Sequence, residues 1–121
     1  MSADRELLEM AAKAFWGDEI DDVCSVRWLD KDECIGYMHG DNQDHNGCDI
    51  ELCWNPLTDD GDALRLAVKL NILTYQTGGD RSYASTPMNW SCTVPHYDND
   101  ALTSTRRAIV LAAAEVGKAM P

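Results

Sequence analysis

Apolar residues recur at helical intervals in three parts of the chain, near both ends and in the middle. Leu7, Ala11 and Phe15 form a stripe in the first part, and similar stripes run through the other two. The first part ends near Gly17, a residue that favours the end of a helix. The pattern therefore predicts three helices, over residues 2–17, 63–70 and 98–120.

Alternating apolar and polar residues predict strands between these helices. The clearest alternation runs over 49–54, where Ile50, Leu52 and Trp54 point to one side. The predicted strands are 22–30, 33–40, 49–54, 71–76 and 86–94, with a Gly-rich turn at 77–82. The order α-β-β-β-α-β-β-α indicates an α+β fold in which one mostly antiparallel sheet packs with three helices. Because no linker or repeat is present, residues 1–121 are expected to form a single domain.

The distribution of charge separates one part of the chain from the rest. The net charge is −11, and residues 18–62 hold 14 of the 21 acidic residues but only two of the 10 basic ones. This balance disfavours direct binding of DNA or RNA, which needs Lys and Arg to replace the counterions of the phosphates. It favours a basic protein partner, and the alternative is a solvated acidic surface that serves solubility.

The predicted partner-binding face combines acidic residues of this segment with one aromatic residue. Trp16 stands at the end of the first predicted helix, where fraying would expose it to a partner. Arg106 and Arg107 form a basic pair, interpreted as solvated helix charges or as contacts to a partner's carboxylate. The acidic residues of the predicted face are Asp30, Asp32, Glu33, Asp41, Asp44, Asp49 and Glu51.

No segment of the sequence is expected to enter or cross a membrane. The N-terminus lacks the apolar core of a signal peptide, and the longest apolar stretch, 108–117, contains Glu115 and is too short to span a bilayer. A cytoplasmic protein is therefore expected. In that reducing compartment the five cysteines, an odd number, are predicted to remain thiols.

The candidates for metal binding and catalysis are weak. Asp59, Asp60 and Asp62 precede a predicted helix, so they are expected to cap its first turn rather than to hold a metal. The loop 42–53 opens like a calcium-binding loop but has Cys53 where a bidentate Glu belongs. The possible zinc ligands, which include no Cys-x-x-Cys pair, are Cys34, His39, His45, Cys48 and Cys53. The sequence predicts no catalytic, cofactor or metal site and a protein that is not an enzyme.

Two stretches, "WNPLTDDGDALRLAVKL" at 54–70 and "STRRAIVLAAAEVG" at 104–117, resemble small accessory proteins of tailed phages and prophages, of the phage ABA-sandwich domain and NinX-like type. In that group a strand ending in Asn-Pro leads into a helix, and a closing helix begins near an Arg-Ala pair. Asn55-Pro56 and Arg107-Ala108 occupy those places here. The resemblance implies a related fold and a setting in the host bacterial cytoplasm. It carries over no catalytic residue, because the function of the group is uncharacterised.

Three functions remain open on these grounds. The first is a non-catalytic accessory protein whose acidic face binds a basic host protein or nucleoprotein complex, inhibiting a nucleic-acid-binding defence complex in the manner of an anti-CRISPR protein. The second is a small metal-binding protein or enzyme centred on the His/Cys loop 39–53. The third is a structural homo-oligomer held together by the Ala-rich last helix or by an exposed tryptophan. The segregation of charge favours the first.

Overall fold

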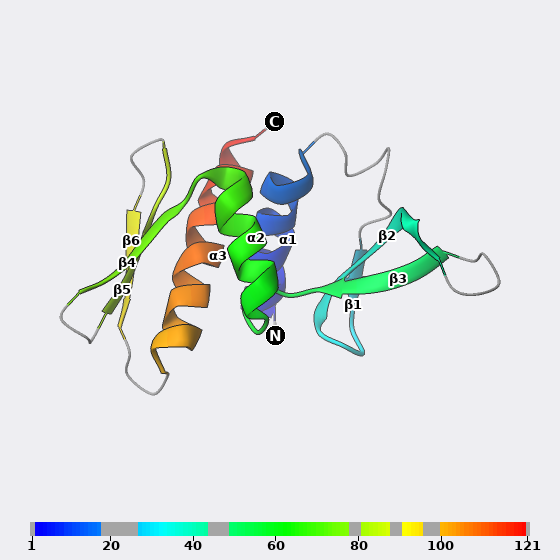
Figure 1. The fold of residues 1–121 in the computed structure, drawn as a ribbon, viewed down its shortest axis with the longest axis horizontal. Coiled ribbons are helices and arrows are strands. Elements are labelled where there is room, and N and C mark those ends of the chain that lie inside the picture. The colour runs from blue at the N-terminus through cyan, green and yellow to red at the C-terminus, as the bar shows by residue number, and fades with distance from the viewer. Residues whose placement is uncertain are drawn as a thin grey trace.

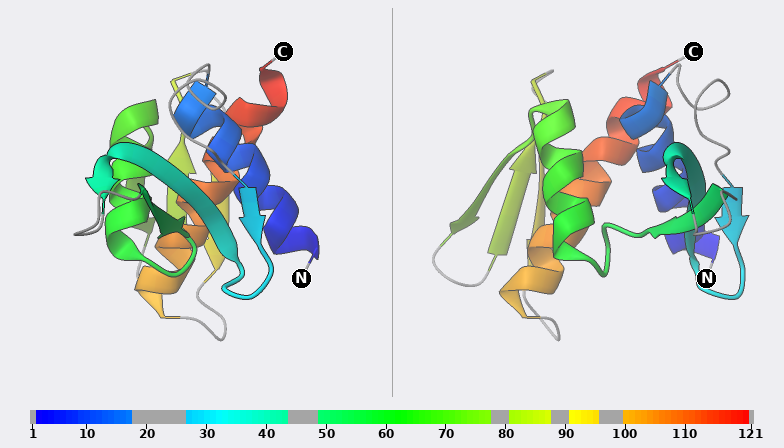
Figure 2. Two further views of the ribbon diagram at one scale, coloured as in Figure 1. Left: turned by 90° about the vertical axis from the view of Figure 1, so that its right-hand side faces the viewer. Right: turned by 45° about the vertical axis from the view of Figure 1, so that its right-hand side comes forward.

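Three helices form a central layer between two small antiparallel sheets (Figure 1). The computed structural model describes residues 2–17, 27–43, 49–77, 81–87, 91–95 and 100–120. One sheet has the strand order β1-β2-β3 and the other β4-β5-β6. The two sheets lie at opposite ends of the long axis, and each turns one face toward the helices (Figures 1 and 2).

The second and third helices begin at aspartates that cap them. The carboxylate of Asp59 accepts a hydrogen bond from the backbone N–H of Asp62 at 2.8 Å, and Asp100 accepts one from Thr103 at 2.8 Å. Asn71 ends the second helix in the left-handed conformation, with φ of 56°. The helices are α1 (Ser2–Trp16), α2 (Asp60–Leu70) and α3 (Ala101–Ala119). In the parts of the chain that the structure describes, no helix has both the length and the apolar character needed to cross a bilayer.

All strand pairs are antiparallel. In the first sheet β2 lies in the middle, and its register against β3 shifts between Met38 and Gln43. In the second sheet β5 lies in the middle, in regular register with both neighbours. The strands are β1 (Arg27–Leu29), β2 (Cys34–Gln43), β3 (Asp49–Trp54), β4 (Leu73–Thr77), β5 (Arg81–Ser85) and β6 (Ser91–Pro95).

The structure confirms the α+β class, the three helices and the approximate order of elements, and it differs from the sequence prediction in two respects. The strands form two sheets instead of one, because the helices, α3 above all, bury apolar residues on more than one side. One strand, β5, replaces part of the predicted turn at 77–82. Its inward side chains, Ser82 and Ala84, are small, so the strand lacks the apolar alternation that would reveal it. The hydroxyl of Ser82 lies 2.9 Å from that of Thr105 on α3.

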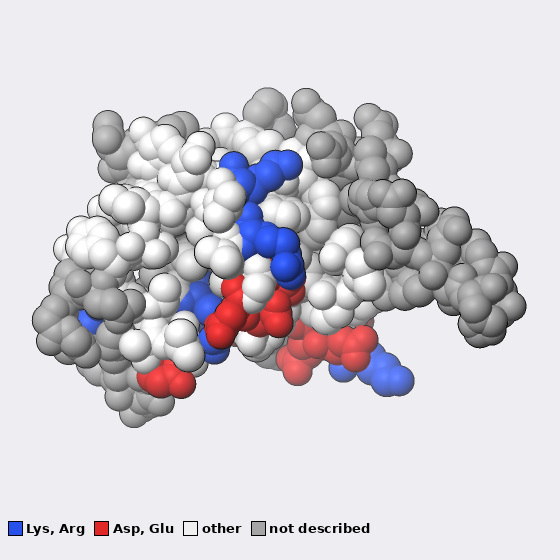
Figure 3. Space-filling model, in the orientation of Figure 1, with Lys and Arg blue, Asp and Glu red and all other residues white. Residues whose placement is uncertain are grey.

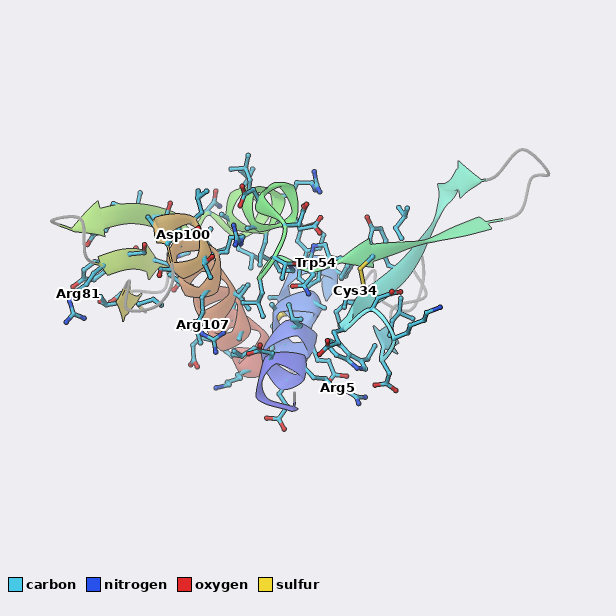
Figure 4. The ribbon with its side chains drawn as sticks, turned by 90° about the horizontal axis from the view of Figure 1, so that it is seen from below. Arg5, Cys34, Trp54, Arg81, Asp100 and Arg107 are labelled. Carbon is cyan, nitrogen blue, oxygen red and sulfur yellow. A yellow bond between two sulfur atoms is a disulfide. The ribbon has the colours of Figure 1, made fainter. Side chains whose placement is uncertain are left out.

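An aromatic cluster fastens the first sheet to the end of α1. Phe15 stacks on Trp54 of β3 with ring centroids 5.4 Å apart, and Trp16 meets the same indole at 5.0 Å. Trp16 also contacts Tyr37 of β2, at 5.2 Å. The predicted exposure of Trp16 is therefore wrong: only 7% of the residue is accessible, because the last turn of α1 packs on the sheet instead of fraying. Figure 4 shows Trp54 between β3 and the helices.

The prediction of free thiols is wrong for two of the five cysteines. A disulfide joins Cys34 of β2 to Cys53 of β3, with their Cα atoms 6.0 Å apart (Figure 4). The antiparallel register explains the pair: Cys53 lies opposite Gly36, so Cys34 is its diagonal neighbour on the same face. Cys24 and Cys48 lie outside the described residues, as does the side chain of Cys92.

α1 and α3 approach each other closely near Gly117. A Cβ atom added at Gly117 would clash with the backbone carbonyl of Met10. The buried small residues of α3 on this and its other inner faces are Ser104, Ala108, Ala112, Ala113, Ala114 and Gly117. These residues let the backbones of neighbouring elements come close to the helix.

We predict that Gly117→Ala destabilises the fold by about 1–3 kcal/mol, because the clash is with backbone that can move only by separating α1 from α3. The matched control is Gly61→Ala in α2, where the added Cβ would meet no backbone and only side-chain atoms, the guanidinium of Arg65 and the capping carboxylate of Asp59, at 3.3 Å or more. That change is expected to be neutral or stabilising by about 0.5–1 kcal/mol, since alanine favours helix more than glycine does. Urea unfolding of the two variants measures both values, and equal stabilities would contradict the close crossing.

Candidate functional site: an acidic face beside the start of α2

Exposed carboxylates from two separate segments gather beside each other. One group lies on the turn between β1 and β2, and the other at the start of α2; Figure 3 shows them next to each other along one side of the molecule. The side-chain amide of Asn55, which precedes α2, donates to the backbone carbonyl of Glu33 at 3.0 Å and ties the two segments together. We call these residues the acidic face: Asp30, Asp32, Glu33, Asp59 and Asp60.

The turn that carries three of these carboxylates is held in one conformation. The indole N–H of Trp28 donates to Asp30 at 2.8 Å, which fixes the side chain at the start of the turn. Glu33 has a φ of 50°, a left-handed conformation that brings the chain back to begin β2. With the bond from Asn55, both ends of the turn are anchored. Among the described residues, no basic side chain forms an ion pair with Asp30, Asp32 or Glu33.

The segment before α2 is held by Asp62, which is buried beneath the acidic face. One carboxylate oxygen of Asp62 accepts from the backbone N–H of Asn55 at 3.0 Å, and the other accepts from Arg65 at 2.6 Å. The hydrogen bond to Asp62 raises the pKa of Arg65 above its ordinary value. The carbonyl of Asn55 accepts from the backbone N–H of Asp59 at 2.9 Å. The prediction that these aspartates cap the start of a helix is confirmed for Asp59. Asp62 has a different role, because it joins the end of β3 to that helix.

Arg106 crosses from α3 to hold the other side of the same segment. Its guanidinium donates to Asp60 at 2.6 Å, to the backbone carbonyl of Leu57 at 2.8 Å and to Thr103 at 3.1 Å. Arg107, the next residue, points instead to Asp4 of α1, at 3.4 Å. Both arginines therefore form contacts within the chain, instead of being solvated helix charges or contacts to a partner. The elements that they join are far apart in the sequence, so these contacts exist only in the folded chain.

The internal ion pairs divide the acidic face into two parts. Asp60 pairs with Arg106, and Asp59 lies 4.0 Å from Arg65, so their charges are partly offset. The three carboxylates of the turn form no ion pair among the described residues, although the exposed Lys31 stands between Asp30 and Asp32. With three acids and one base the turn keeps a net charge of −2, so most of the unbalanced negative charge of the face lies there.

Two pockets open on either side of the segment 55–58. The smaller has a volume of about 180 Å³ and combines apolar side chains with the carboxylates of Asp4 and Glu33. Leu8 is almost fully buried, whereas Glu33 is exposed, which places the apolar residue deep and the carboxylate near the opening. The second pocket, of about 360 Å³, includes Arg65. The apolar residues of the smaller pocket are Leu8, Trp28 and Leu57.

The predicted partner-binding residues have three different outcomes. The structure brings Asp30, Asp32 and Glu33 together as exposed residues. Trp16 is buried and cannot contact a partner there. Asp44 lies outside the described residues, and so do the side chains of the strand residues Asp41, Asp49 and Glu51.

Sequence reasoning missed the contributions of three acidic residues to this surface. Asp59 and Asp60 belong to the same acidic segment of the chain, and that segregation was the signal that would have included them. Asp4 comes from α1, far away in the sequence, and no local pattern connects it to the turn.

The described residues contain no group of three or more His, Cys, Asp or Glu side chains placed to hold a metal ion. Of the possible zinc ligands, Cys34 and Cys53 are joined to each other. His45 and Cys48 lie outside the described residues, as does the side chain of His39. Residues 44–48 of the stretch that resembles a calcium loop lie outside the described residues, and its last residues, 49–53, belong to β3.

Comparison of the chain with protein families, curated proteins and solved structures found no match. The resemblance to phage accessory proteins therefore remains an expectation from the sequence. What the chain does has to be inferred from its own surfaces.

We predict that Arg106→Ala destabilises the protein by about 1–3 kcal/mol, because it leaves the carbonyl of Leu57 and the carboxylate of Asp60 without their donor. The neighbouring change Arg107→Ala removes only a long, half-exposed contact and is expected to cost about 0–1 kcal/mol. Thermal unfolding of the two variants provides the comparison. If Arg107→Ala proved the more harmful, the structural role assigned to Arg106 would be wrong.

Proposed function

We propose that the protein is a non-catalytic accessory protein that binds a basic surface of another protein through its acidic face. The observation that carries this proposal is the turn of Asp30, Asp32 and Glu33, three exposed carboxylates that form no ion pair among the described residues and outnumber the single cation of the turn, Lys31. Because Trp28 and Asn55 already fix the turn, a partner would bind it without having to order it first. Complementary charge of this kind steers association and gives specificity.

The smaller pocket supports a partner that presents a lysine or an arginine. Such a side chain has an apolar stem and a cationic end, and the pocket offers buried Leu8 below and the carboxylates of Asp4 and Glu33 nearer the opening. The indole of Trp28 can attract a cation, since the guanidinium of Arg5 lies 5.6 Å from its ring centroid. A basic side chain from a partner would replace Arg5 at this ring.

The class of partner follows from the charge of the whole chain and from the family resemblance. With a net charge of −11, the chain is suited to proteins that themselves bind nucleic acids, because an acidic protein can occupy a groove that receives phosphates. The resemblance to phage and prophage proteins supports a bacterial host as the setting. Together they favour a nucleic-acid-binding host defence complex as the target, and inhibition of that complex as the effect.

The test is a triple variant, Asp30→Asn with Asp32→Asn and Glu33→Gln. It removes the charge of the turn and keeps an acceptor for the indole N–H of Trp28. The probe is a purified Lys- and Arg-rich nucleic-acid-binding protein of the bacterial host, freed of nucleic acid, and binding is measured by calorimetry at low and high salt. We expect the dissociation constant to rise about tenfold or more at low salt, and the salt dependence to become weaker.

A second triple variant, Glu6→Gln with Glu9→Gln and Glu115→Gln, serves as the matched control. It changes the net charge by the same amount at carboxylates of α1 and α3 that lie outside the acidic face. The control is expected to bind almost as well as the natural chain. Equal losses in the two variants would show that total charge, and not this face, determines binding, and the proposal would then be wrong.

A further inference from the structure

Most of the large apolar side chains that the described residues expose lie on two neighbouring elements. Leu64 and Val68 stand one turn apart on α2, while Leu73 and Tyr75 share one face of β4. We call these four residues the β4 surface. Figure 3 shows uncharged atoms extending from α2 across β4, beside the row of basic side chains on α2. Another exposed leucine, Leu102, stands apart at the start of α3.

The strand β4 forms an edge of its sheet and lacks the features that usually protect such an edge. Within the described residues it pairs only with β5. Its sequence, Leu73–Thr77, contains no charged residue and no proline, and its register has no bulge. Proteins commonly block exposed edges with lysine, proline or bulges, because unpaired backbone groups there can pair with another strand. The opposite edge strand, β6, does end in a proline, Pro95.

We propose that β4 pairs with β4 of a second copy of this chain, joining two three-stranded sheets into one continuous antiparallel sheet. A strand that can pair with its own copy about a two-fold axis favours a second copy as the partner, and charge limits where the two copies can meet. Two chains that each carry a net charge of −11 repel each other over most of their surfaces and can approach closely only where acidic residues are absent. The β4 surface meets that condition, because its four residues are uncharged and the charged side chains beside it on α2 form a basic row (Figure 3).

The geometry of β4 suits pairing with itself. An antiparallel pair of identical strands has a two-fold axis perpendicular to the sheet, and the middle residue of this five-residue strand is Tyr75. Tyr75 already stacks on Tyr83 of β5, with centroids 4.8 Å apart and the rings 3° from parallel. Pairing about Tyr75 would therefore extend one tyrosine pair into a row of four across the new sheet.

The same two-fold axis also places both helical layers on one face of the joined sheet. The α2 helices of the two copies then flank the line where the strands meet. Leu64 and Val68 of each copy, exposed in the single chain, would lie beside that line. Leu73 and Tyr75 lie on the other face of the sheet, with Tyr83, where the pairing brings each of them beside the second copy. The pairing thus involves both faces of the edge and the unpaired backbone of β4.

The test is the mass of the full chain in solution, measured by light scattering and sedimentation from micromolar to submillimolar concentration. The natural chain is expected to reach about twice the monomer mass of 13.4 kDa. Leu73→Lys places a charge on the edge strand and is expected to weaken association about tenfold or more. The matched control is Leu102→Lys, since Leu73 and Leu102 are almost equally exposed, at 63% and 61%. Val68→Lys on α2 tests the same contact if Leu73→Lys does not fold.

Amide hydrogen exchange distinguishes strand pairing from a contact through side chains alone. Exchange in 73–77 is expected to slow as the protein concentration rises, whereas exchange in the other edge strand, 91–95, should stay unchanged. A chain that remains monomeric throughout, equal effects of Leu73→Lys and Leu102→Lys, or a dimer without protection of 73–77 would each overturn the proposal. None of these outcomes depends on the acidic face, so the two proposals can fail separately.

Discussion

The arrangement of the other helices and of the second sheet depends on how closely they can approach α3. This helix lies in the middle of the molecule and buries alanine on several sides, including Ala108 and Ala112. On one side the small inward residues of β5 let the second sheet lie against it, and on another Gly117 lets the backbone of α1 come into contact. Each small residue gains little free energy from its own burial. Small residues stabilise the fold mainly by letting backbones come close together, which brings larger side chains elsewhere into contact.

The first sheet is held to this helical core through a few large residues. Trp54 is almost fully buried among Phe15 and Trp16, although its indole N–H has no hydrogen-bond acceptor among the described residues. An unpaired buried donor costs about 1–3 kcal/mol, so the aromatic contacts must outweigh that cost. These aromatic contacts affect function by fixing the position of the first sheet. The cluster, Asp62 and Arg106 together fix where β3 ends and α2 begins, and thereby hold the acidic face in place.

Features determined by neighbouring residues could be predicted from the sequence, and features determined by distant ones could not. The cap at the start of α2 and the short turn after β1 depend on local chain geometry. The aspartates before residue 63 predicted the cap, and the break between the predicted strands 22–30 and 33–40 predicted the turn. The burial of Trp16 and the pairing of Cys34 with Cys53 depend on where α1 meets the sheet and on the register of two strands. In the candidate site, the acidic turn was predictable, whereas the pocket that adds Asp4 exists only because α1 packs beside it.

The acidic face and the β4 surface also affect each other physically. Exposed carboxylates contribute little individually, typically about 0–1 kcal/mol for each ion pair, and salt screens them. A single acidic face would therefore bind a basic surface weakly under cellular conditions. Pairing through β4 would place two such faces on one particle, and the second contact would then form at a high effective concentration without any new interaction. This would explain why so acidic a chain keeps an uncharged edge strand: pairing through that strand would convert a weak electrostatic contact into a bivalent one.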